Sequence, residues 1–141
     1  MNRLMVAAAV LAAATITACA SDTETVSNAV VERGGELYQT NCASCHGTDL
    51  AGAPDWKTPN EDGSYPAPPH DSSGHTWHHS DRLLIEIIRD GSNAPQTRMP
   101  AFGDQLTDDD IEAILEFIKA SWGPQEKDYQ SQVTEQEETR S

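Results

Sequence analysis

The stretch Gln39–Leu50, "QTNCASCHGTDL", holds two cysteines with two residues between them and a histidine directly after the second. Cysteine pairs at this spacing occur in redox disulfides, zinc sites and haem attachment. A structural zinc site takes about four ligands, usually with two separated thiolate pairs, and the chain has no second C-x-x-C. A redox dithiol is typical of a βαβ unit, and no strand pattern is visible. The motif therefore favours covalent haem c on Cys42 and Cys45, with His46 binding the iron.

The iron needs a second axial ligand, and Met99 is the candidate. It is the only methionine beyond residue 5, in the proline-flanked segment "RMPAFG" (98–103). Methionine is usually core filler, but this loop position favours ligation. A thioether is a soft neutral ligand that raises the reduction potential. With both axial positions filled, we expect outer-sphere electron transfer and no oxygen chemistry.

The first residues predict an export signal at residues 1–18. Arg3 precedes the apolar run Leu4–Ile16, which is shorter than the about 20 residues that span a bilayer. The segment "ITAC" ending at Cys19 resembles a bacterial lipobox, which implies lipidation of Cys19 and an anchor on the periplasmic side of the membrane. The alternative is cleavage after Ala20 within "ACA" (18–20), which leaves a soluble periplasmic protein.

Beyond this signal the sequence predicts one all-α domain at residues 28–123, preceded by a polar tether at 19–27. Helical spacing of apolar residues indicates helices over 28–40, 81–90 and from 108 onward. Ser80 and Thr107 are the expected N-caps, and Gly91 and Gly123 the expected stops. Residues 124–141 have almost no apolar side chains and are expected to be disordered.

Charge restricts the partners. The 141 residues contain 23 Asp+Glu and 9 Lys+Arg, a net charge of −14, so nucleic acid, which is itself anionic, is not an expected partner. An acidic surface can instead steer a redox protein that docks through a basic patch. The alternative is that the charge serves solubility or a salty habitat. Nothing in the sequence indicates the oligomeric state.

Residues 28–122 resemble the class I monohaem c-type cytochromes. The resemblance rests on "GGELYQTNCASCHG", "LLIEIIRDG" and "MPAFGDQLTDDDIEAILEFIKASW", in that order. It implies three main helices around haem c, with His46 and Met99 as axial ligands. It also implies that the first and last helices cross, with Gly34 and Tyr38 against Ile114 and Phe117. In this family a proline carbonyl accepts the other N–H of the proximal histidine; Pro68 or Pro69 is expected here, with Pro54 as the alternative.

One stretch is not explained by the resemblance, "GHTWHHSD" at residues 74–81, and a further histidine precedes it. These side chains could line the haem and bond its propionates, hold a second metal such as copper, replace Met99 as axial ligand, or be ordinary loop residues. The candidates are His70, His75, Trp77, His78 and His79.

The sequence thus predicts a single-electron carrier and not an enzyme. One alternative is a cytochrome subunit that feeds an oxidoreductase. A second alternative, from a different class, is a periplasmic metal or redox sensor that uses the histidine loop.

Overall fold

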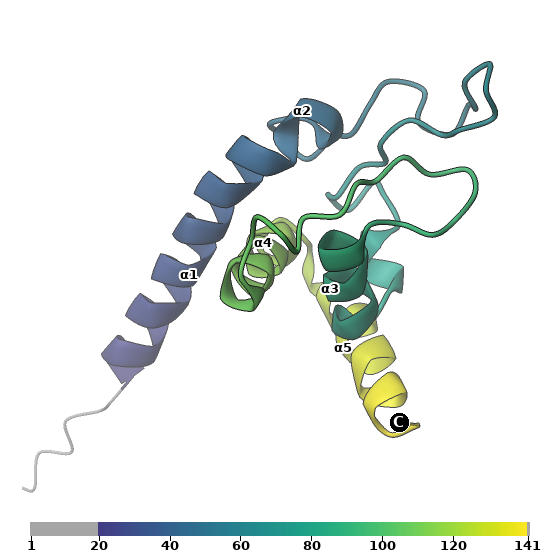
Figure 1. Ribbon diagram of the computed structural model, residues 1–141. Coiled ribbons are helices and arrows are strands. Elements are labelled where there is room, and N and C mark those ends of the chain that lie inside the picture. The colour runs from purple at the N-terminus through teal and green to yellow at the C-terminus, as the bar shows by residue number, and fades with distance from the viewer. Residues whose placement is uncertain (1–19, 141) are drawn as a thin grey trace, which may run out of the picture.

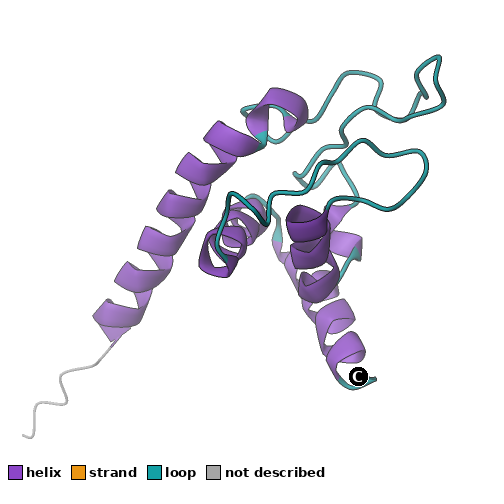
Figure 2. Ribbon diagram, viewed as in Figure 1, coloured by secondary structure: helices purple, strands orange, loops and turns teal. Residues whose placement is uncertain are grey.

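The computed structural model describes residues 20–140, and within that range the chain consists of helices joined by turns and loops, without strands (Figure 2). The predicted all-α fold is therefore confirmed. The proposed signal peptide and Cys19 lie outside the described residues. The elements are α1 (Ala20–Asn41), α2 (Ala43–His46), the 3-10 helix η1 (Thr76–His78), α3 (Asp81–Asp90), α4 (Asp108–Ala120) and α5 (Pro124–Glu138).

The crossing of α1 and α4 forms the centre of the fold. Gly34 lies directly against the backbone of α4, since a Cβ added there would be 1.9 Å from the Ala113 carbonyl oxygen. One turn further along α1, the ring of Tyr38 packs on Phe117 at 5.3 Å between centroids. Tyr38 and Ile114 are completely buried. The helix crossing implied by the resemblance is confirmed, and Ala113 is the residue beneath Gly34.

Replacing Gly34 by alanine is expected to destabilise the protein by about 2 kcal/mol. Overpacking costs about 1–3 kcal/mol, and the upper end applies because the obstacle is backbone. Alanine recovers about 1 kcal/mol of helix propensity. Thermal or denaturant unfolding measures the change.

Gly35→Ala is the matched control for this substitution. Its Cβ would meet the Phe117 ring edge at 3.1 Å, and that ring can tilt away. The gain in helix propensity of about 1 kcal/mol should offset the cost of displacing this ring. The free energy of unfolding of Gly35→Ala should therefore stay near the wild-type value. Equal effects of the two substitutions would contradict a close backbone crossing at Gly34.

The helices α3 and α4 have the predicted caps. Ser80 Oγ accepts a hydrogen bond from Leu83 N, and Gly91 ends α3 with φ 78°. Thr107 and Asp110 bond each other's backbone N–H in a capping box at the start of α4. The inner faces of both helices supply much of the core: Leu84, Ile88, Ile111, Ile114, Leu115 and Ile118.

The C-terminal segment differs from the prediction, since residues 124–138 form α5 instead of a disordered tail. The helix docks through polar side chains at the start of α3. Gln130, 2% exposed, donates to the His79 carbonyl and to Asp81. Thr134 Oγ1 accepts from Asp81 N at 3.1 Å, and Glu137 bonds Ser80 and Arg82. Apolar periodicity cannot reveal a helix that docks in this way.

The N-terminal boundary also differs, because α1 begins at Ala20 and not at Asn28. The predicted tether is thus helical from Ala20 onward. The sequence has neither glycine nor proline between Ala20 and Arg33. Helix propagation is favourable once a nucleus exists, so the packed part of α1 can extend toward the N-terminus.

Candidate functional site

The candidate residues lie on segments that meet at one end of the molecule. Figure 1 shows the loops 47–75 and 91–107 at the end where α1 passes into α2. Tyr65 N donates to Gln96 O at 2.8 Å and ties the two loops together. The C-x-x-C-H motif, the histidine loop and the Met99 loop therefore belong to one region.

The two cysteines lie one helical turn apart. Tyr38 O accepts from Cys42 N, and Cys42 O accepts from His46 N, so the motif continues the helical path of α1 into α2. Residues three apart on a helix share a face, which lets both thiols reach one flat molecule. Both are free, with Cys42 buried and Cys45 exposed. Burial raises the pKa of Cys42 to about 11, which keeps this thiol protonated.

His46 is buried, and its tautomer is set by its hydrogen bond. Its Nδ1–H donates to the Pro68 carbonyl oxygen at 2.9 Å, so the carbonyl predicted at Pro68 or Pro69 is that of Pro68. Burial lowers the pKa of His46, although the bond to Pro68 acts in the opposite direction. The imidazole is therefore neutral, and its Nε2 carries the lone pair that a metal requires.

These residues fit haem c. Two unpaired thiols on one helical face, followed by a neutral imidazole with a free Nε2, form the donor set that covalent attachment and proximal ligation need. Large apolar side chains that are only partly buried pack around the same core and can cover a flat apolar ring: Leu37, Ile85, Met99, Phe102 and Phe117.

Met99 is held in its loop by the end of α3. Its carbonyl accepts from Ser92 N at 3.1 Å, and it lies 3.0 Å from where a Cβ on Gly91 would be. Phe102 N donates to Ile88 O at 3.0 Å, which fixes the following residues to the same helix. The side chain of Met99 is partly buried against the core. Ligation by Met99 stays a prediction.

The histidines of the loop separate into different environments. His70 stacks on His46 with ring centroids 4.0 Å apart. His75 stacks on Trp56 and lies edge-on to His79 at 5.5 Å. Burial lowers the pKa of both His75 and His79. Across residues 20–140 no three His, Cys, Asp or Glu side chains form a group that could hold a metal ion, so the second-metal interpretation finds no support.

Trp77 is partly buried against protein side chains. Its ring lies edge-on to His78 at 3.8 Å and to Tyr129 of α5 at 5.4 Å. Its Nε1 is buried and has no hydrogen-bond partner in the described part of the chain. The contact with Tyr129 could not be anticipated without α5. A role of Trp77 or His78 beside the haem stays a prediction.

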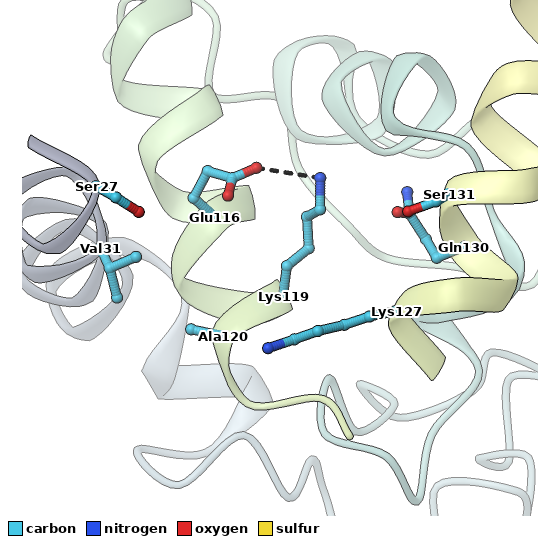
Figure 3. A pocket seen from close by; sticks show the side chains of 8 residues that line it. All are labelled: Ser27, Val31, Glu116, Lys119, Ala120, Lys127, Gln130 and Ser131. Atoms are coloured by element: carbon cyan, nitrogen blue, oxygen red, sulfur yellow. Dashed lines mark ion pairs between the residues drawn. The ribbon is translucent and has the colours of Figure 1, made fainter. Parts of the chain in front are cut away.

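Two grooves run along α5 and do not coincide with this site. One, of about 310 Å³, is bordered by α1, α4 and α5, with Lys127 extending toward Ala120 (Figure 3). The other, of about 470 Å³, lies between α5 and the start of α3 and includes His78 and His79. The lining residues of both grooves exclude Cys42, Cys45, His46 and Met99.

Comparison with models of known protein families gives a match. The family model described as cytochrome c oxidase, cbb3-type, subunit III matches residues 29–118, which includes the C-x-x-C-H motif and Met99 and ends before α5. No curated protein and no solved structure matches significantly. None of the helices within residues 20–140 has both the length and the hydropathy needed to cross a membrane.

Proposed function

This chain belongs to the family of cytochrome c oxidase, cbb3-type, subunit III, a family of c-type cytochromes, and from that premise we propose a single-electron carrier with His46 and Met99 as axial ligands. The chain is an electron-transfer protein with covalently bound haem c. The observation that best supports His46 as proximal ligand is its hydrogen bond to Pro68, which leaves Nε2 free to bind iron.

Haem would supply the one-electron chemistry, and residues of the chain would attach it and bind its iron. Cys42 and Cys45 would hold it at the end of α1, and the Pro68 carbonyl keeps His46 in the tautomer that can bind iron. Met99 would be the second ligand to the iron, and its soft thioether would favour Fe(II). With both His46 and Met99 bound to the iron, the haem would exchange electrons with a partner and would not bind small substrates.

The partner that we propose carries a basic patch. Asp104, Asp109 and Glu112, which follow the Met99 loop, are exposed and form no ion pair with residues 20–140. Asp108 forms an ion pair with Arg89 at 2.8 Å. Asp110 forms an ion pair with Arg33 and is part of the capping box with Thr107. Most of the cations described are in ion pairs: Arg33, Arg82, Arg89, Arg98 and Lys119.

Electron transfer to a basic redox protein should therefore be fast at low salt and slow as salt rises. The Debye length falls from about 30 Å at 0.01 M to about 10 Å at 0.1 M ionic strength. Stopped-flow mixing of the reduced protein with a basic or an acidic small redox protein measures both rates. Absence of transfer to either would count against the carrier function.

Matched charge changes locate the docking face. Asp104→Asn with Asp109→Asn should slow transfer to the basic partner at low salt, because long-range attraction weakens. Glu138→Gln, at the end of α5, removes a charge elsewhere and should leave the rate unchanged. If the transfer rate does not depend on salt, and neither the Asp104 and Asp109 exchanges nor Glu138→Gln change it, an apolar docking face at Pro100, Ala101 and Phe102 would be favoured.

We also propose an extracytoplasmic location, with a lipid anchor on Cys19. The support is the lipobox-like "ITAC" and the need of covalent haem for an exported polypeptide. Several acyl chains hold a protein firmly on a membrane, so wild-type protein should fractionate with membranes and Cys19→Ser should be soluble. Unchanged membrane association of Cys19→Ser would point to a protein partner as the anchor.

A second candidate is a role as the cytochrome subunit of an oxidase. The description of the matched family favours it. A subunit should co-purify in a stable complex with an oxidase after mild detergent extraction, whereas a free carrier should elute alone from size-exclusion chromatography.

A further inference from the structure

The segment Pro68–His70 is held in place from several directions. Leu50 O accepts from His70 N at 2.8 Å, and His70 O accepts from Trp122 Nε1 at 2.7 Å. The backbones of Gly52 and Gly74 pack directly on this segment. A Cβ on Gly52 would lie 2.5 Å from Pro69 N, and one on Gly74 would lie 2.1 Å from Pro69 O. This segment is therefore a fixed platform beside His46.

The side chain of His70 is fixed as well. Thr76 Oγ1 lies 3.3 Å from Pro69 O and 2.9 Å from His70 Nδ1. The hydrogen bond between Thr76 and His70 holds the Nδ1 edge of the imidazole, whichever of the two groups donates the proton. Tyr38 closes another side, with its ring edge-on to His70 at 6.2 Å between centroids. The imidazole of His70 thus has one orientation.

His70 presents the face of its ring to His46. The centroids are 4.0 Å apart and the planes are inclined by 24°, which is a stacked arrangement. The hydrogen bond from His46 to Pro68 fixes one edge of the His46 ring, but a single bond permits the ring to rock about it. A flat neighbour on the face of the ring restricts that motion. Pro68 and His70 are on the same segment, so their two constraints act together.

From this geometry we propose that Pro68 and His70 form a two-point clamp on His46, in which His70 is a positioning residue that fixes the plane of the iron-binding imidazole. The inference depends on the proposed ligation by His46.

Because its ring lies on the face of the His46 ring, His70 would act on the iron through His46 and would not itself take the place of Met99.

The orientation of an axial imidazole plane is recorded in the ferric electron paramagnetic resonance spectrum. His70→Leu replaces the ring by an aliphatic side chain of similar volume and should shift and broaden the low-spin signal. His70→Phe keeps a flat ring and should give a signal close to the wild-type one. Glu138→Gln, at the exposed end of α5, is the control and should leave the signal unchanged. Haem content and far-ultraviolet circular dichroism establish that each variant is folded.

Each outcome decides a different question. A His70→Leu signal identical to wild type, or a His70→Phe signal as perturbed as that of His70→Leu, overturns the clamp while the proposed function stands. A wild-type ferric signal without low-spin character contradicts ligation by His46 and Met99, and the clamp with it. If His70→Leu does not fold, Thr76→Val, which releases His70 Nδ1, should broaden the signal; an unchanged signal in that variant also overturns the clamp.

Discussion

Exchange of Met99 for leucine is expected to lower the reduction potential by on the order of 0.1 V, within the range of about 0.8 V that axial ligands span. Leucine has a similar volume but no sulfur, so it keeps the packing of this partly buried side chain and removes the ligand that favours Fe(II). The ferric protein should also lose its weak sulfur-to-iron absorption band in the red. Spectroelectrochemical titration measures both changes.

The Met99→Leu variant should also bind carbon monoxide when reduced, because the sixth coordination position is open. Wild type should not bind it. Phe102→Leu is the control, since it changes an apolar side chain of the same loop without touching a sulfur atom. A Met99→Leu protein with wild-type potential and no carbon monoxide binding would contradict Met99 as ligand, and His75, His78 or His79 would become the candidates to examine.

Local signals in the sequence predicted α3 and α4 well. Ser80 and Thr107 each have a side-chain oxygen next to an amphipathic run, and both helices begin directly after them. The end of α3 at Gly91 follows from a positive φ that glycine accepts readily. These predictions succeeded because the determining contacts are within a few residues of each other along the chain.

The features that were missed depend on contacts between distant segments. The helix α5 is polar on most of its surface, and its docking depends on Gln130 meeting Asp81 and the His79 carbonyl. No periodic pattern records such a contact. The stacking of His70 on His46 likewise depends on the path of residues 47–75, and a histidine in a proline-rich loop has many possible roles.

The proline that accepts the proton of His46 could be predicted only in part from the sequence. The resemblance limited the proton acceptor to Pro68, Pro69 or Pro54, but the selection required the loop geometry. Pro68 O is 2.9 Å from His46 Nδ1, whereas Pro69 O accepts from Thr76. A shift of one residue along the loop exchanges these roles, and sequence spacing in an irregular segment cannot exclude such a shift.

Loss of both cysteines of the motif is expected to have the largest effect on the cofactor. In Cys42→Ser with Cys45→Ser, no thioether can form, and haem should be held only by its axial ligands and apolar contacts. Acid removes a proton-accepting ligand such as His46 from iron, so haem should then extract completely. The exchange Cys19→Ser serves as the control, because it also removes a cysteine but leaves the motif intact.

The most direct test of the central claim is therefore acid–acetone extraction of the purified protein, followed by haem staining of the polypeptide. The claim that Cys42 and Cys45 carry haem c predicts that all haem stays with the wild-type and Cys19→Ser chains and that none stays with the double variant. Free extraction of haem from the wild type, or retention of haem by the double variant, would contradict it.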